Sequence, residues 1–206
     1  MTKRRHFSML REFKLADFLT LGNGFSGAGA ILCLFKYVVT NDRTFLWVAF
    51  ALFPIALVCD VLDGRVARLR SEASLLGQEL DSLADCVSFG VAPAVLAFAL
   101  GMQGGWDMLV LVYFVGCGIS RLARYNATAA LLSDESGKVK YFEGTPIPTS
   151  LVLVATLAVL VGMHRVNDLL PLGAIDLGPA ALHPLVLMFA ASGTAMISKT
   201  LRIPKP

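Results

Sequence analysis

Residues 60–85, DVLDGRVARLRSEASLLGQELDSLAD, decide the fold of this chain. Four carboxylates lie here in two pairs, Asp60 with Asp63 three residues apart and Asp81 with Asp85 four residues apart. Both halves of the stretch belong to segments that are apolar and long enough to cross a membrane. Because a carboxylate at membrane depth is energetically costly, these four residues are candidates for a functional site. Their spacing predicts two neighbouring helices that build a metal site together.

The composition predicts an all-α, polytopic membrane protein. The 206 residues are 56% hydrophobic and 16% charged, and the mean hydropathy is +0.68. Soluble domains are about 45–50% apolar and about 25% charged. We expect a single domain over residues 1–206, with a short arm at 1–14. Six membrane helices are expected near residues 16–39, 44–68, 78–102, 106–131, 147–164 and 181–199.

The positions of Lys and Arg predict how the helices are oriented in the membrane. Basic residues gather in four stretches, at 1–14, 65–70, 121–140 and 199–205. The predicted loops on the opposite side have only Arg43 and Arg165, so both termini and the carboxylates are predicted to be cytoplasmic. The net charge of +3 is small, and this pattern indicates membrane topology rather than nucleic-acid binding.

The N-terminal arm mixes basic and apolar side chains over residues 4–13. This pattern predicts a short amphipathic helix on an anionic membrane surface. A disordered basic tail is the alternative.

The first half of the decisive stretch places its functional residues on one helix face. At about 100° per residue, Asp60, Asp63, Gly64 and Ala67 fall within about 100° of arc, with Arg68 at the edge. Gly64 and Ala67 lack bulk, so a neighbouring backbone or a ligand can approach this face closely.

In the second half, Gly77, Asp81 and Asp85 are four residues apart and form one stripe. A short turn between the helices brings the two faces together. Four converging carboxylates would repel one another, and divalent cations such as Mg²⁺, Mn²⁺ or Ca²⁺ would relieve that repulsion. Two ions with open positions would indicate a phosphate-bearing substrate. The alternative is neutralisation by nearby arginines, namely Arg65, Arg68 and Arg70.

Eight residues of this stretch resemble the signature of the CDP-alcohol phosphotransferase family, and every fixed position of that signature is present. They are Asp60, Asp63, Gly64, Ala67, Arg68, Gly77, Asp81 and Asp85. The resemblance implies a six-helix membrane enzyme that forms a homodimer. It also implies a reaction in which the hydroxyl of a second substrate displaces CMP from a CDP-linked lipid or alcohol. Two divalent cations, Mg²⁺ or Mn²⁺, are expected in each protomer.

The same resemblance implies roles for individual residues. Three are expected to be metal ligands, namely Asp60, Asp63 and Asp81. Asp85 is expected both to lie at the metal and to act as the general base. The CDP moiety is expected to contact Asp60, Gly64, Ala67 and Arg68. Thr20 and Asn23 on the first helix are possible cytidine contacts, although small and polar residues there also suit close helix packing.

Three further stretches, residues 88–94, 121–126 and 142–148, resemble the branch of the family that joins CDP-diacylglycerol to serine. Arg121 and Arg124 are three residues apart on one helix and could bind the serine carboxylate. They could instead be cytoplasmic anchors or lipid-phosphate partners. Tyr125, where relatives of this branch carry Phe, is expected to line the same pocket. Gly144 and Pro146 make a stiff entry to the fifth helix, which suits either a serine site or a plain helix start.

Two other functions remain open at this point. The acceptor could be glycerol phosphate, inositol phosphate or choline. A transporter of ions or protons would also carry intramembrane carboxylates, although it would spread them along a pathway. The expected partners are therefore CDP-diacylglycerol, serine and membrane lipids, without nucleic acid.

Overall fold

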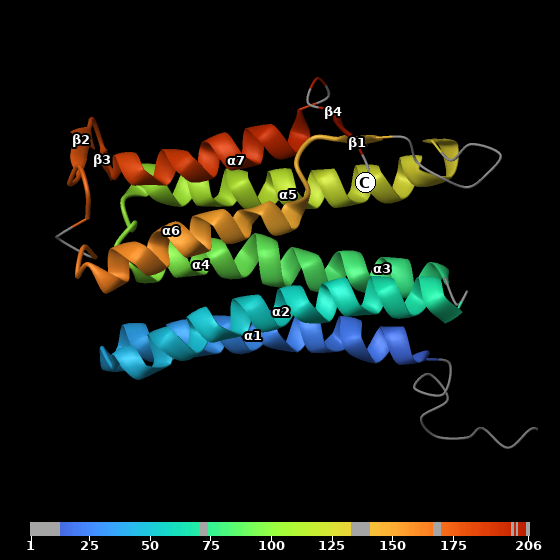
Figure 1. The fold of residues 1–206 in the computed structure, drawn as a ribbon. Coiled ribbons are helices and arrows are strands. Elements are labelled where there is room, and N and C mark those ends of the chain that lie inside the picture. The colour runs from blue at the N-terminus through green and yellow to red at the C-terminus, as the bar shows by residue number, and fades with distance from the viewer. Residues whose placement is uncertain are drawn as a thin grey trace, which may run out of the picture.

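A computed structural model describes residues 13–70, 74–132, 141–166, 170–198, 200 and 202–204. The expected amphipathic helix in the N-terminal arm lies outside the described residues. The helices run roughly parallel to one long axis, so the described part of the molecule is an elongated bundle (Figure 1). The end of α2 (Arg43–Arg70) and the start of α3 (Leu75–Asp85) lie at one end, here called the site end. The hairpin of β2 (Ile175–Leu177) and β3 (Ala180–Leu182) lies at the other, the far end.

Four long helical segments form most of the bundle. They are α1 (Leu15–Thr40), α2 (Arg43–Arg70), α3 (Leu75–Asp85) continued by η2 (Cys86–Val91) and α4 (Ala92–Ala99), and α5 (Gly105–Leu132). Two shorter segments follow, η3 (Ile147–Ser150) with α6 (Leu151–Gly162), and η5 (Pro184–Val186) with α7 (Leu187–Ile197). Within the described residues, the four long segments are long and apolar enough to cross a membrane, and the two shorter ones are apolar. The chain is a multi-pass membrane protein, and the count of six spans stays a prediction.

The structure also has two small antiparallel pairs of strands. The all-α prediction did not include these strands. β1 (Tyr141–Glu143) pairs with β4 (Arg202–Pro204), and β2 (Ile175–Leu177) pairs with β3 (Ala180–Leu182). The fold is therefore nearly, but not wholly, α-helical. The last helical segment begins at Pro184 rather than near residue 181 because β3 occupies the preceding residues.

The third segment was predicted over residues 78–102. It begins at Leu75 and ends at Ala99, so each limit lies three residues earlier than predicted. Its start is fixed by Ser74, whose side chain accepts a hydrogen bond of 3.0 Å from the amide of Gly77. Its end is fixed by Gly101, which adopts a φ of 111°.

The middle of this segment widens into a π-helix over Cys86–Val91. Pro93 has no amide hydrogen and its ring would meet the carbonyl four residues earlier, so an α-helical hydrogen bond is lost here and regular winding is disfavoured. The amide of Ala92 bonds instead to the oxygen of Val87. Gly27 of α1 lets that helix approach this turn closely, because a Cβ on Gly27 would lie 2.6 Å from Cα of Ser88. The Ser88 hydroxyl donates to the Asn23 carbonyl at 2.9 Å.

The core lies between the helices along the apolar length of the bundle. Phe53, Phe89, Phe114 and Phe189 are among its largest fully buried side chains. The rings of Phe114 and Phe189 meet edge to face with 5.2 Å between their centroids, which joins α5 to α7.

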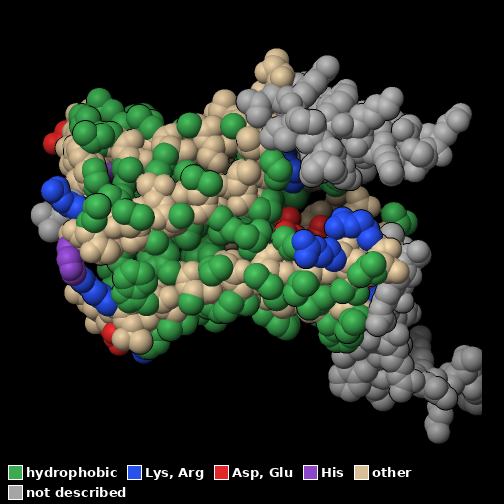
Figure 2. Space-filling model, viewed as in Figure 1, with side chains coloured by type: hydrophobic (Ala, Val, Ile, Leu, Met, Phe, Trp, Pro, Cys, Tyr) green, Lys and Arg blue, Asp and Glu red, His purple; other side chains and the backbone are tan. Residues whose placement is uncertain are grey.

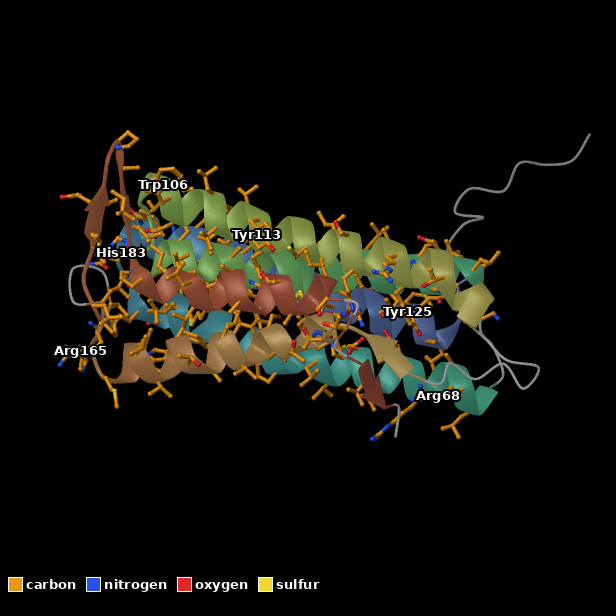
Figure 3. All side chains as sticks on the ribbon, turned by 90° about the horizontal axis from the view of Figure 1, so that it is seen from above. Arg68, Trp106, Tyr113, Tyr125, Arg165 and His183 are labelled. Atoms are coloured by element: carbon orange, nitrogen blue, oxygen red, sulfur yellow. The ribbon has the colours of Figure 1, made fainter. Side chains whose placement is uncertain are left out.

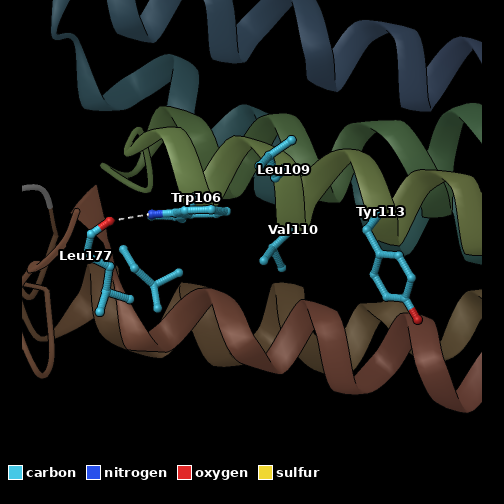
Figure 4. A pocket seen from close by; sticks show the side chains of 6 residues that line it. Trp106, Leu109, Val110, Tyr113 and Leu177 are labelled. Carbon is cyan, nitrogen blue, oxygen red and sulfur yellow. Dashed lines mark hydrogen bonds between the residues drawn. The ribbon is translucent and has the colours of Figure 1, made fainter. Parts of the chain in front are cut away.

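The far end is closed by contacts between the start of α5 and the β2–β3 hairpin. Trp106 donates a hydrogen bond of 2.8 Å to the carbonyl of Leu177 (Figure 4). Six residues line an apolar pocket beside it, namely Trp106, Leu109, Val110, Tyr113, Leu177 and Leu182. Since no charged side chain lines this pocket, it differs in character from the site at the other end.

Candidate active site

Three carboxylates from two helices meet at the site end. Asp60 and Asp63 come from α2 and Asp81 from α3, and one oxygen of each lies within 4.8 Å of the others. Asp63 is buried and the other two are half-buried. Asp85, also buried, lies outside this tightest group, with its carboxyl against that of Asp60. The structure thus brings together the four residues that the spacing singled out.

Helix α1 supplies hydrogen-bond donors to two of these carboxylates. The Thr20 hydroxyl lies 2.7 Å from Oδ2 of Asp63 and 3.1 Å from its own helix carbonyl at Ala16. Asn23 donates from Nδ2 to Oδ1 of Asp85 at 3.0 Å. Thr20 and Asn23 therefore help to orient the carboxylates, a role that the sequence interpretation missed. Their expected contact with cytidine stays a prediction.

Oδ1 of Asp81 is buried, and no group in the described part of the chain is its hydrogen-bond partner. Buried polar atoms are nearly always paired, so an orphan of this kind calls for an explanation. Among the described residues, Arg65 and Arg68 form no ion pair with the cluster, which removes part of the alternative in which arginines neutralise it. A cluster of hard oxygen donors with an unpaired oxygen fits a divalent cation such as Mg²⁺ or Mn²⁺.

The two signature glycines have different surroundings. A Cβ on Gly64 would meet only the guanidinium of Arg68, at 3.8 and 4.0 Å, so this face of α2 is open to a ligand. Ala67, one turn further along, is half-buried. A Cβ on Gly77 would lie 2.9 Å from Oδ1 of Asp17, a buried residue that also accepts a 2.8 Å hydrogen bond from the Lys14 amide. Gly77 is therefore required by close packing of α3 on α1.

Helix α5 adds a positive charge to the same region. Arg121 is close enough to Asp81 and Asp85 to interact with both electrostatically. Its guanidinium carbon also lies 5.7 Å from the centroid of the Tyr125 ring. Arg124 is half-buried on the same helix. The structure thus places Arg121 beside the carboxylates and Tyr125 beside Arg121, and their serine-binding role stays a prediction.

Gly144 and Pro146 have a structural explanation of their own. Gly144 has a φ of 75°, and a Cβ there would collide with the backbone of Met196. The amide of the next residue, Thr145, donates to the Ala195 carbonyl at 3.2 Å. Pro146 directly precedes η3. The contacts of this loop therefore join it to α7, and its serine-binding role stays a prediction.

The space-filling view shows the setting of these side chains. Acidic side chains lie in a hollow near the site end, with basic side chains beside them (Figure 2). Arg68 and Tyr125 lie toward this end, whereas Trp106, Arg165 and His183 lie toward the far end (Figure 3). The charged hollow and the closed far end are thus separated by the length of the bundle.

Comparison with known proteins agrees with this geometry. Residues 13–195 match the family described as CDP-alcohol phosphatidyltransferase. A Saccharomyces cerevisiae protein named CDP-diacylglycerol–serine O-phosphatidyltransferase is 48% identical over 204 residues, which cover 98% of this chain and 74% of that protein. A Methanocaldococcus jannaschii protein of the same name is 32% identical over 164 residues, 80% of this chain and 70% of its own. A Mycobacterium leprae protein, again of that name, is 45% identical over 118 residues, 54% of this chain and 38% of its own. The chain is therefore a membrane enzyme of the CDP-alcohol phosphatidyltransferase family.

Proposed function

We propose that this enzyme transfers the phosphatidyl group of CDP-diacylglycerol to the hydroxyl of L-serine, giving phosphatidylserine and CMP. The observation that carries the proposal is the convergence of four carboxylates from α2 and α3 with Arg121 beside them. The relatives from yeast, an archaeon and a mycobacterium share one name, which specifies serine as the acceptor.

Enzymes of this family depend in general on divalent metal. We assign the ligands to Asp60, Asp63 and Asp81, with Asp85 beside them, for two Mg²⁺ or Mn²⁺ ions in each protomer. When bound, such ions would neutralise the carboxylates and polarise the pyrophosphate of the CDP-lipid. The open face at Gly64, with Ala67 and Arg68 nearby, leaves room for the CDP moiety.

Asp85 is the proposed general base. The serine Oγ forms a bond to the phosphorus of the phosphatidyl group, while the bond from that phosphorus to the oxygen leading to CMP breaks. CMP leaves with this oxygen, and the hydroxyl proton of serine passes to the Asp85 carboxylate. The hydrogen bond from Asn23 to Oδ1 holds this carboxylate in place.

Arg121 is the proposed partner of the serine carboxylate, together with Arg124. An arginine can bind a carboxylate through two parallel N–H bonds, which fixes the orientation of the acceptor. Arg121 is half-buried, so its charge is only partly screened by solvent. The ring of Tyr125 supports its guanidinium from one side.

The remaining features of the proposal concern the cell and the assembly. The distribution of basic residues supports placing both termini and the site on the cytoplasmic side. The family resemblance supports a homodimer. The closeness of the carboxylates to one another, at one end of the bundle, favours an enzyme over a transporter.

A direct test is an acceptor screen with purified protein and CDP-diacylglycerol. CMP release is followed in parallel with serine, glycerol phosphate, inositol phosphate and choline, each with Mn²⁺, Mg²⁺ or a chelator. We expect metal-dependent release with serine alone. Release with another acceptor and not with serine would overturn the assignment of substrate, and metal-independent release would overturn the assignment of the carboxylates.

A further inference from the structure

A polar network joins α3 to α5 just beyond the carboxylate cluster. Asn126 donates from Nδ2 to the Ser82 hydroxyl at 3.0 Å. Its Oδ1 lies 3.3 Å from Nε2 of Gln78 and 3.3 Å from the Ser82 hydroxyl. All three side chains are half-buried. None of them belongs to the family signature, and the function proposed above gives them no role.

The network continues the stripe of functional residues on α3. Gln78, Asp81, Ser82 and Asp85 are spaced so that they share one helix face. Gln78 and Ser82 meet Asn126, while the two carboxylates face Arg121. The polar face of α3 is thus in contact with α5 at two levels, one through charge and one through hydrogen bonds.

Other contacts between these two helices are sparse. α3 packs chiefly against α1 and touches α5 at few places. Its apolar side chains Leu75, Leu76 and Leu83 are exposed rather than packed against α5. The hydrogen bonds of Asn126 are therefore well placed to fix the spacing between the helix that carries two carboxylates and the helix that carries Arg121.

We propose that Asn126 is a positioning residue, which holds α5 against α3 and so keeps Arg121 on the acceptor side of the carboxylates. The inference rests on the proposed function for its consequence on serine. Removal of the amide breaks the bonds that Asn126 makes to Gln78 and Ser82 across the two helices, and the Ser82 hydroxyl then keeps its bond to the Gln78 carbonyl within α3. With these bonds lost, the gap between the helices can widen. The acceptor, proposed to bind at Arg121 of α5, is affected more than the nucleotide, proposed to bind at the open face of α2 around Gly64.

The kinetic test compares Asn126→Ala with Thr128→Ala. Thr128 lies on the same helix, but its hydroxyl bonds only within that helix, to the Arg124 carbonyl at 2.8 Å. We expect Asn126→Ala to raise the serine KM about tenfold and the CDP-diacylglycerol KM less than about twofold, as for the loss of partly buried hydrogen bonds. Thr128→Ala should change neither. Equal effects on both substrates, or no effect on serine, would overturn the inference.

Ser82→Ala and the double variant show whether the two side chains act through each other. Residues that act as one contact give strongly non-additive effects. The double variant should therefore resemble Asn126→Ala alone in its serine KM. If the two effects multiply, the contact between these side chains is not what positions Arg121.

Hydrogen exchange gives a readout that does not depend on turnover. In lipid nanodiscs, the amides of α3 should exchange faster in Asn126→Ala than in the unaltered protein, and Thr128→Ala should leave them unchanged. Unchanged exchange in Asn126→Ala would overturn the positioning role, whatever happens to the serine KM. Absence of serine turnover in the unaltered protein would instead defeat the proposed function, while exchange would still test the link between the helices.

Discussion

Asp107 at the far end and Asp81 at the site end are acidic residues in very different surroundings. Asp107 is fully buried, and its oxygens accept hydrogen bonds from the amides of Gly104 and His183, at 2.8 and 2.7 Å. The His183 ring lies 2.6 Å from Oδ2. Asp81 instead has a buried oxygen that no described group approaches as a partner.

The difference separates structural from functional charge. A carboxylate whose partners all come from its own chain is already stabilised, and its purpose is to join segments. A cluster of carboxylates that repel one another reduces stability, which is the reason for the proposal that a ligand completes it. On that proposal, the same residue type joins segments at one end and binds a ligand at the other.

The largest expected difference between the two ends is in turnover, measured for Asp85→Asn at the site end and Asp107→Asn at the far end. Removal of a general base typically costs about 10²–10⁴ in rate, so we expect Asp85→Asn to lower kcat about 10³-fold. Binding of CDP-diacylglycerol should remain measurable. Asp107→Asn, measured by the same CMP release assay, should keep most of its turnover while it is folded. Substantial turnover in Asp85→Asn would show that another group takes the proton.

Stability should show the reverse order, with the larger loss caused by a substitution at the far end. Asp107→Ala leaves the partly buried amides of Gly104 and His183 without their acceptor, and we expect a loss of about 2 kcal/mol in the free energy of unfolding. Asp81→Asn relieves repulsion, so with a chelator it should melt at or above the temperature of the unaltered protein. With Mn²⁺ present, the unaltered protein should gain more than Asp81→Asn. Equal gains from Mn²⁺ would remove Asp81 from the set of ligands.

Arginines at the two ends offer a third contrast. Arg121→Ala should lower kcat/KM for serine about thirtyfold, the effect of losing hydrogen bonds to a charged group. The KM for CDP-diacylglycerol should change far less. Arg43, whose guanidinium contacts the His164 ring at 2.9 Å at the far end, is the matched control, and Arg43→Ala should leave both values unchanged. Equal changes for both substrates in Arg121→Ala would argue against recognition of the serine carboxylate.

The smallest expected difference is in stability, between alanine substitutions at two glycines. A Cβ on Gly77 would press against Asp17, so Gly77→Ala should destabilise the protein by about 1–3 kcal/mol. Gly116 on α5 has open space around it, so Gly116→Ala should stabilise the helix by up to about 1 kcal/mol. Thermal unfolding in one detergent would compare them. If both variants melted alike, the close approach of α1 to Gly77 would be in doubt.

The sequence predicted the parts of the fold that depend on local periodicity. The spacing of Asp60, Asp63, Asp81 and Asp85 predicted two helix faces, and a short turn allowed only one way to bring them together. Helix limits were off by a few residues where a capping residue or a strand decided them, as at Ser74 and β3.

Contacts between distant residues could not be predicted in this way. His164 and His183 show no ligand spacing in the sequence, yet each has a partner on another element, at Arg43 and Asp107. The Asn126 network likewise joins residues more than forty positions apart. The three-residue strands are too short to show an alternating pattern.

The wide turn over Cys86–Val91 has a consequence for how this enzyme can change. A π-helical turn accommodates one more residue than a regular turn, so it sets the rotation of everything before it relative to everything after. Deletion of a single residue there, with a return to regular winding, would leave α3 and α4 in nearly the same relative rotation. Deletion of one residue from the regular part of either helix would instead swing Asp85 by about 100° relative to the helix beyond the deletion. We therefore expect relatives to tolerate the loss of one residue within this turn, and to lose the geometry needed for turnover when one residue is lost beside it.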